Sequence, residues 1–109
     1  MLNANDAIQS APVFAALGDT TRLKLVSRLS DGNQHSIVQL AKGLKLSRQG
    51  VTKHLYVLKK AGMVSSKRIG RESRFTLRLR TLTRARDCLN RASAQWDETI
   101  ERLKISVEN

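Results

Sequence analysis

The sequence has few cysteine, histidine and aromatic residues, which stabilise many small proteins. Its 109 residues include one cysteine, Cys88, and two histidines. A single cysteine excludes an intramolecular disulfide, and this set falls short of the thiolate and imidazole ligands of a structural zinc site. Aromatic residues amount to only 4% of the chain, so the core must consist of aliphatic side chains. So small an aliphatic core often needs a second copy of the chain for stability.

Signals for export and for membrane insertion are also missing. The N-terminal stretch MLNANDAIQSAPVF lacks the basic and apolar regions of a secretory signal. No apolar run approaches the roughly 20 residues of a membrane span. We therefore expect a soluble, cytoplasmic protein without a membrane partner. Its length suits one small domain, so residues 1–109 are expected to form a single unit.

No arrangement of side chains typical of catalysis is visible. His35 and His54 have no evident nucleophile or carboxylate partner, and no pair of carboxylates stands out. We therefore expect neither an enzyme nor a bound cofactor or metal.

Positive charge is in excess and is unevenly distributed. The chain has 20 Lys and Arg against 9 Asp and Glu, a formal net charge of +11. Residues 42–91 contain most of the basic side chains and only two acids, Glu72 and Asp87. So concentrated a charge indicates a polyanionic partner. Nucleic acid is favoured over an anionic membrane surface, because the basic segment offers only Tyr56 and Phe75 as aromatic anchors.

Apolar periodicity and capping residues predict five helices. Asp19, Ser36 and Ser47 are N-cap residues in front of helical apolar spacing. Pro12 predicts a break in the first helix or a late start of it. The predicted helices cover about residues 5–17, 19–30, 36–42, 47–61 and 80–107. The residues expected to face inward from the second helix are Leu23, Val26 and Leu29.

Between the last two helices the apolar period changes from helical to alternating. Met63–Ile69 and Glu72–Arg78 are predicted strands, joined by a tight turn at Gly70 and Arg71. The fold class is therefore mainly α with a β-hairpin, a winged helix-turn-helix with its helix-turn-helix at 36–61 and its wing at 63–78. The wing's basic residues are expected to project from the tip and one face, toward phosphates or a minor groove. They are Lys67, Arg68, Arg71 and Arg74.

The helix at 47–61 carries residue types suited to the major groove of duplex DNA. Val51, Leu55 and Leu58 recur at helical spacing, so that face is expected in the core and the opposite face of the first two turns toward DNA. Base readout is expected from Arg48, Gln49 and Thr52. Phosphate contacts are expected mainly from Ser47, Lys53, His54 and the wing arginines.

Each of these residues also has a plainer interpretation. Arg48 and Lys53, taken singly, are equally well explained as solvated helix charges, and Thr52 as a phosphate contact without specificity. Gly50 costs about 1 kcal/mol in a helix interior. We therefore expect a reason for it, either packing against the third helix or close approach to the DNA backbone.

The last helix carries an apolar stripe of coiled-coil spacing. Its members are Leu82, Ala85, Leu89, Ala92, Trp96, Thr99 and Leu103, with Ile100 beside Thr99. A helix of this length is too long for so small a domain to cover fully. We therefore favour partial packing against a second copy over packing of one face on its own domain alone.

Three segments together resemble the ArsR family of winged-helix repressors over about residues 13–78. They are LGDTTRLKLVSRL, LAKGLKLSRQGVTKHLYVLKKAGMV and RIGRESRFTL. The matching motifs are Asp19–Arg22, Thr52–Leu55, Ala61–Val64 and the wing Gly70-Arg71. The resemblance implies a homodimer that is joined through the first and last helices and represses transcription from a palindromic operator. The expected dimer contacts are Phe14, Leu82, Ala85, Leu89, Ala92, Trp96, Ile100 and Leu103.

The sequence departs from the sensing members of that family. Their Cys-x-Cys metal site on the third helix is replaced here by Ser36-Ile37-Val38-Gln39, and the last helix has no histidine. Redox-sensing members use paired cysteines, whereas Cys88 stands alone and is interpreted as a small apolar residue. We therefore expect a regulator that does not respond to metal. A protein-binding winged-helix module and a repressor gated by an unknown small molecule remain the alternatives.

Overall fold

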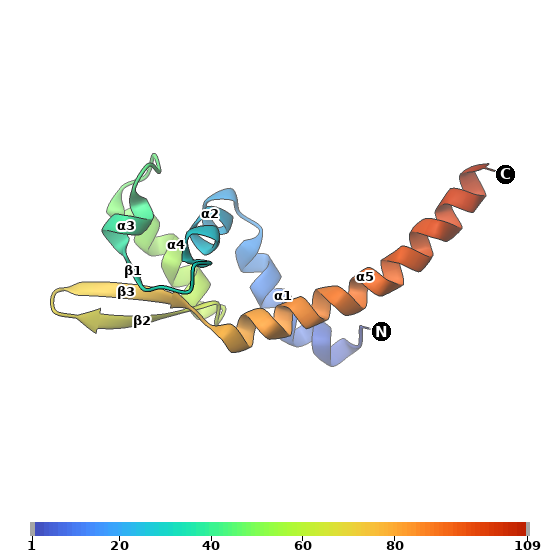
Figure 1. Cartoon of the computed structure of the whole chain (residues 1–109), viewed down its shortest axis with the longest axis horizontal. Helices are drawn as coiled ribbons and strands as arrows, with labels where there is room; N and C mark the ends of the chain where they lie inside the picture. The colour runs from blue at the N-terminus through green and yellow to red at the C-terminus, as the bar shows by residue number, and fades with distance from the viewer. Residues whose placement is uncertain (1, 109) are drawn as a thin grey trace.

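The computed structural model describes residues 2–108, and within them five helices and three strands follow one another along the chain (Figure 1). The helices are α1 (Ala4–Leu17), α2 (Thr20–Leu29), α3 (Ile37–Ala41), α4 (Arg48–Lys60) and α5 (Leu79–Glu108). The strands are β1 (His35–Ser36), β2 (Val64–Ile69) and β3 (Glu72–Leu77). The predicted winged helix-turn-helix is confirmed, with α3 and α4 as its two helices and β2 and β3 as its wing.

The predicted N-caps are where three of the helices begin. The side chains of Asp19, Ser36 and Ser47 accept hydrogen bonds from the backbone N–H groups three residues ahead, which the first turn of a helix leaves without an intrahelical partner. Gly62 follows the end of α4 with a φ of 80°, a left-handed conformation that favours glycine and ends a helix.

The expectation that Pro12 breaks or delays the first helix is wrong. Helix α1 begins at Ala4, capped by Asn3, and runs through Pro12 to Leu17. Pro12 is exposed, so water can solvate the carbonyl that loses its partner. Val13 and Ala16, in the turn that follows, are buried in the core and hold the helix in place across the proline.

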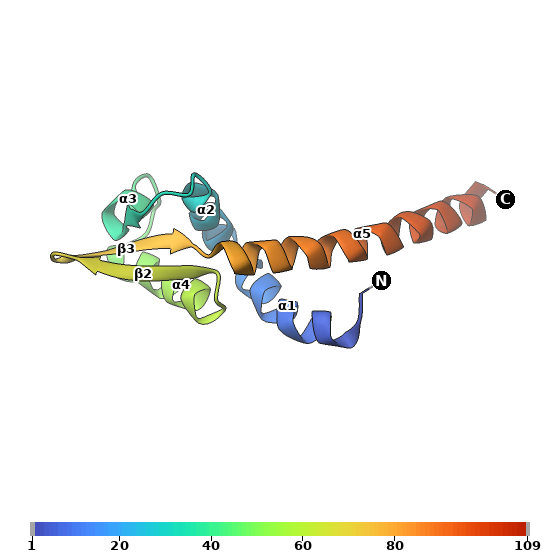
Figure 2. The same cartoon turned by 60° about the horizontal axis from the view of Figure 1, so that its bottom comes forward.

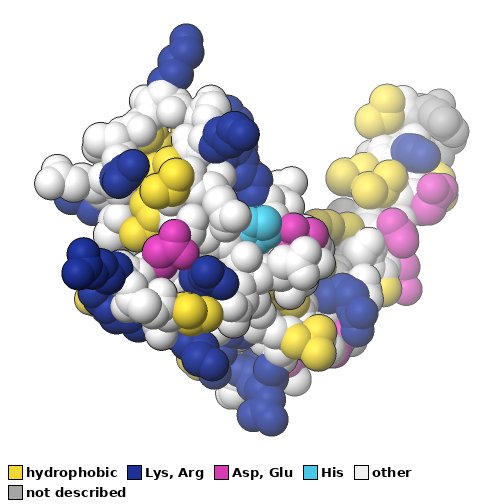
Figure 3. Space-filling model, turned by 60° about the vertical axis from the view of Figure 1, so that its left-hand side comes forward, with side chains coloured by type: hydrophobic (Ala, Val, Ile, Leu, Met, Phe, Trp, Pro, Cys, Tyr) yellow, Lys and Arg dark blue, Asp and Glu magenta, His cyan; other side chains and the backbone are white. Residues whose placement is uncertain are grey.

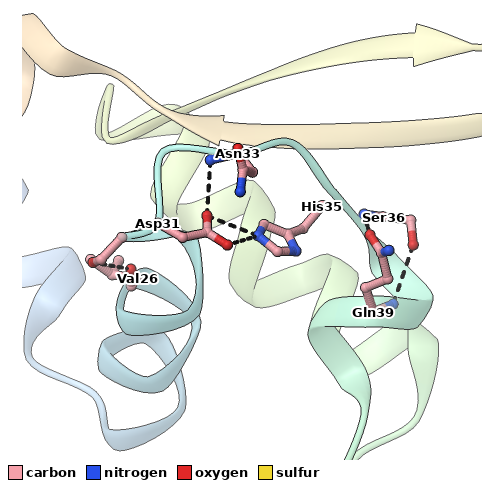
Figure 4. Close-up of polar contacts among 7 residues, drawn as sticks. Val26, Asp31, Asn33, His35, Ser36 and Gln39 are labelled. Carbon is pink, nitrogen blue, oxygen red and sulfur yellow. Dashed lines mark hydrogen bonds and ion pairs between the residues drawn. The ribbon is translucent and has the colours of Figure 1, made fainter.

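The sheet has one strand more than the sequence predicts. The order is β1-β3-β2, with β1 antiparallel to β3 through His35 opposite Phe75. Figure 4 shows the contacts of Asp31 in the turn before this two-residue strand. Its carboxylate accepts a hydrogen bond from the Asn33 backbone N–H at 2.8 Å and lies 2.8 Å from His35 Nε2. Ser36 then ends β1 and caps α3. So short a strand has no alternating pattern that a sequence could display.

The core is aliphatic, as expected, and lies between α2, α4 and the sheet. Val51, Leu55 and Leu58 of α4 are completely buried, which confirms the inward face predicted for this helix. In α2 the prediction is partly wrong, since Leu23 is half exposed and Leu25 is completely buried in its place. The inward face of α2 is centred on Leu25 and Leu29, at i, i+4 spacing.

Helix α5 is covered by its own domain over its first half only. Ala85, Cys88 and Ala92 are buried where α5 runs beside α1, and the Arg91–Asp6 ion pair joins the two helices at 3.0 Å. Figures 1 and 2 show α5 continuing past α1 and away from the domain. The same stripe is exposed there, with Trp96 at 58% and Leu103 at 61% of their surface.

Candidate nucleic-acid interface

The first two turns of α4 present four polar side chains to solvent. Arg48, Gln49, Thr52 and Lys53 are all exposed and line one shallow hollow on the surface. The Ser47 cap starts the helix here, and the buried face at Val51 and Leu55 turns these side chains outward. The side chains named from sequence as base-reading are therefore brought together on one surface.

The wing places its basic residues on two faces and the tip. In the register of β2 and β3, Lys67 lies opposite Arg74, and Arg68 lies opposite Ser73 on the other face, which also carries Phe75. The expectation that all four residues project from the tip and one face is therefore wrong for Arg68. The reason is the alternation of side chains along a strand, which puts neighbours such as Lys67 and Arg68 on opposite faces.

The wing tip and the start of α4 face each other across a hollow of about 340 Å³. Its lining includes Arg48 of α4, Arg71 and Glu72 of the wing, and Ser36 and Val38 at the start of α3. Two guanidinium groups from separate elements thus border one space of a size that admits a phosphate group. Ser36 and Val38 are not among the DNA contacts expected from sequence, and only the folded chain brings them beside Arg48.

Like charges gather at this end of the molecule. Lys67 and Arg74 are directly opposite each other, an arrangement that is unfavourable without an anion nearby. Glu72 relieves part of this repulsion, since its carboxylate lies 3.2 Å from Arg74 Nε. In the face drawn in Figure 3, Lys and Arg side chains surround the wing end and most Asp and Glu lie toward the receding α5. Such a surface attracts a polyanion.

Two of the predicted DNA contacts, Ser47 for phosphate and Thr52 for bases, have hydroxyl groups that already form a hydrogen bond within the chain. Ser47 Oγ accepts from the Gly50 backbone N–H at 3.0 Å, and Thr52 Oγ1 donates to the Arg48 carbonyl at 2.7 Å. Both hydroxyls are exposed and keep further hydrogen-bonding capacity. Lys59, which was not singled out, donates to Ser66 Oγ at 2.7 Å and ties α4 to the wing.

His54 is held by the fold, in contrast to its neighbour Lys53. Its Nδ1 lies 3.3 Å from a terminal guanidinium nitrogen of Arg22 and 3.8 Å from the Asp19 carboxylate. The expectation that both histidines lack a carboxylate partner is therefore wrong, because His35 pairs with Asp31 as well. Each partner comes from a helix end or turn that folding places beside the ring.

The two carboxylates beside the histidines have shifted acidities. The Arg22 backbone N–H, which donates to Asp19, lowers the pKa of that carboxyl, and the Arg22 charge adds to this effect against opposing burial. The Asn33 backbone N–H lowers the pKa of Asp31 in the same way, with a further contribution from His35.

Two negative findings apply to the described residues. Within 2–108 no group of three or more His, Cys, Asp and Glu side chains gathers closely enough to hold a metal ion. Over the same range, no helix is both long and apolar enough to cross a membrane. Cys88 is buried, in the α5 segment that packs beside α1.

Comparison with protein families matches residues 19–66 to the bacterial regulatory proteins of the arsR family. This range covers α2 to the first residues of β2, and so includes the whole helix-turn-helix. Among curated proteins, the uncharacterized HTH-type transcriptional regulator YuzN of Bacillus subtilis is 40% identical over 65 residues, which are 54% of this chain and 71% of YuzN. The transcriptional repressor SmtB homolog of Synechocystis is 31% identical over 77 residues, which are 71% of this chain and 58% of that protein.

Solved structures show the same fold over nearly the whole chain. An ArsR-like transcriptional regulator from Rhodococcus superimposes with a TM-score of 0.73 at 35% identity, covering 93% of this chain and 94% of that one. The homodimeric winged helix-turn-helix DNA-binding domain of Mb0332 from Mycobacterium bovis gives a TM-score of 0.61 at 20% identity, covering 93% and 87%. The likeness includes α5, which lies outside the segment matched by the family model.

Proposed function

We propose that this chain, which belongs to the ArsR family of bacterial regulatory proteins, represses transcription as a homodimer bound to a palindromic operator. Its winged helix-turn-helix is a DNA-binding domain, and its family and relatives are transcriptional regulators, not enzymes. One observation carries the proposal. Arg48, on the exposed polar face at the start of α4, and Arg71, at the cationic wing tip, line the same hollow.

In this proposal α4 is the recognition helix and enters the major groove by its first two turns. Arg48 pairs with guanine, Gln49 with adenine, and Thr52 with a base edge or a thymine methyl. Lys53 and the Ser47 hydroxyl bind phosphates. Arg71 at the wing tip, with Lys67, Arg68 and Arg74 behind it, binds the flanking phosphates or minor groove.

The proposed dimer uses the part of α5 that its own domain leaves uncovered. The stripe continues from the buried Ala85 and Ala92 into the exposed Trp96, Ile100 and Leu103. Exposed apolar side chains at coiled-coil spacing favour burial against a second helix of the same kind. The homodimeric state of Mb0332, which has the same fold, supports this arrangement. A twofold dimer would set two α4 helices in successive major grooves, about 34–36 Å apart.

We further propose that the regulator acts in the cytoplasm, where bacterial DNA is, and does not respond to metal. Cys88 is the only thiol of the sequence, and the α5 segment contains no histidine. Soft-metal sites need several such ligands at fixed spacing. Repression, as opposed to activation, is supported by the repressor that is 31% identical.

The test is selection of bound sequences from random duplex DNA by the full chain, followed by footprinting of the selected sequence. We expect a palindrome with half-sites one helical turn apart and protection on one face of the DNA. Recovery of no preferred sequence would overturn the proposal and favour a protein-binding module. Transcription from a promoter that carries the selected site is then expected to fall when the protein is added.

A further inference from the structure

His54 lies one residue after the DNA-facing side chains of α4, yet the fold already uses its Nδ1. Arg22 of α2 approaches this nitrogen to 3.3 Å from one terminal guanidinium nitrogen. A guanidinium carries donors only, so Nδ1 must be the acceptor and the ring hydrogen must lie on Nε2. The ring is three-quarters buried, with a side-chain exposure of 25%, which limits its freedom to turn away from this contact.

The Arg22 side chain is itself held by a second helix, α1. Its Nε donates to the Ala16 carbonyl, one of the α1 carbonyls that has no partner inside the helix. Its backbone N–H donates at 3.0 Å to Asp19, the N-cap of α2. The guanidinium of this α2 residue therefore joins the end of α1 to the second turn of α4, while its backbone takes part in the N-cap of α2.

This contact adds a directional restraint to the apolar packing that already faces α4 toward the core. Leu25, Leu29 and Leu55 hold α4 against α2 by apolar packing, which is non-directional. A hydrogen bond from a planar guanidinium that also donates to the Ala16 carbonyl restrains the rotation of α4 about its axis. Because Arg48 and Thr52 must meet base edges with the geometry of hydrogen bonds, a small rotation of α4 is costly to base readout and nearly harmless to phosphate attraction.

We propose that Arg22 is a positioning residue for DNA recognition, and that its hydrogen bond to His54 Nδ1 sets the orientation in which α4 enters the major groove. The inference rests on the proposed binding of an operator. It assigns to His54 an internal role in place of the phosphate contact expected from sequence.

The test uses two substitutions of His54, and each places a polar group at the position of only one of the two ring nitrogens. His54→Asn places an amide oxygen where Nδ1 stood, so it retains an acceptor for Arg22, whereas His54→Gln extends a donor toward the position of Nε2. Binding of each full-length variant is measured on the selected operator and on unrelated duplex DNA. We expect His54→Asn to bind the operator within about twofold of wild type, and His54→Gln to lose about fivefold to tenfold with unchanged binding to unrelated DNA.

The opposite result would overturn the proposal. If His54→Gln binds like wild type and His54→Asn weakens on both DNAs, His54 acts through Nε2 on a phosphate. Equal behaviour of the two variants on the operator would also overturn it. If wild type selects no operator at all, the proposed function fails first, and the two failures are thereby distinguished.

Two further measurements do not depend on how well the His54 variants fold. Arg22→Lys keeps the charge but carries all its donors on one nitrogen, in place of the two separate nitrogens that contact Ala16 and His54, so it should weaken operator binding as His54→Gln does. In the wild-type protein without DNA, a long-range proton–nitrogen NMR spectrum recorded at mildly alkaline pH should show His54 with its hydrogen on Nε2. A hydrogen on Nδ1 would rule out the Arg22 contact.

Discussion

Arg48 and Arg71 lie on different elements, one on the recognition helix and one at the wing tip, although both border the same hollow. An arginine on a base edge and an arginine on a phosphate have different consequences when they are removed, because only the first carries sequence information. Substitution at these two positions therefore separates the recognition of base sequence from the general attraction of DNA phosphates.

We expect Arg48→Ala to lose about 1–3 kcal/mol of operator binding free energy and to relax the preference for sequence at one position of each half-site. Arg71→Ala should weaken operator and unrelated DNA alike and reduce the slope of log affinity against log salt by about 0.9 for each phosphate that is no longer neutralised. Fluorescence anisotropy at several salt concentrations measures both effects. Identical salt slopes and equal loss of preference in the two variants would contradict the assignment.

A second prediction at this scale concerns Asp19 and Asp31, whose pKa values are lowered by hydrogen bonds from backbone N–H groups. A carboxyl with a lowered folded pKa adds stability above its unfolded value of about 3.9, and this contribution is lost as the pH falls through the folded pKa. The melting temperature should therefore fall as the pH is lowered below about 4. Asn can still cap α2 at position 19, so the double variant Asp19→Asn with Asp31→Asn should show a flatter acid limb. An unchanged limb would show that other carboxyls dominate.

At the scale of the elements, α4 contains a glycine, Gly50, that the packing of the fold does not require. A Cβ built on Gly50 would meet Ser47 Oγ at 3.5 Å and Leu46 Cβ at 3.7 Å, which are ordinary contacts. Packing against α3, one of the two reasons expected from sequence, thus finds no support. Close approach of DNA is the reason that remains.

Gly50→Ala is accordingly expected to raise the free energy of unfolding by about 0.5–1 kcal/mol, because alanine loses less backbone entropy in a helix. Chemical denaturation measures the change. Gly70→Ala is the matched contrast, since Gly70 at the wing turn has a φ of 64° that disfavours a side chain, and it should lose about 1 kcal/mol. A destabilised Gly50→Ala variant would reveal a contact that the fold does not show.

At the scale of the whole molecule, the fold divides the apolar stripe of α5 into two parts. The first part packs on its own domain, and the second part is exposed. Leu82 packs on the edge of the core and Ala85 and Ala92 are buried in it, while Leu89 is half exposed before the helix leaves α1 behind. Phe14, expected at the dimer contact, packs partly against the core. The exposed half of the stripe is centred on Trp96, Ile100 and Leu103. A second copy of the chain would bury the largest apolar surface there.

Leu103→Glu is expected to convert a dimer into a monomer, since a carboxylate on the exposed half of the stripe would be buried without a partner. Ala94→Glu adds the same charge on the opposite, exposed face of α5 and should leave the dimer intact. Analytical ultracentrifugation over a range of concentrations measures the dissociation constant of each protein. Equal dissociation constants for both variants would exclude the stripe as the interface. The monomer should also bind the palindrome less tightly than the dimer does.

Much of this architecture could be predicted from local signals. The caps at Asp19, Ser36 and Ser47, the apolar face of α4 and the change of period at the wing all act over a few residues, and each is confirmed. The strand at His35 was missed because two residues have no period, and the inward residue of α2 was misassigned because Leu23 and Leu25 are equally apolar.

The sequence alone determined the fold class, the placement of α4 and the wing, and the concentration of charge, because helix capping, side-chain periodicity and net charge are properties of neighbouring residues. Only the tertiary structure decided that Arg22 reaches His54, that Arg71 shares a hollow with Arg48, and where along α5 the stripe stops being covered. Each of these depends on residues that are distant in sequence. Their meeting is set by how helices pack around the core, which no local pattern records.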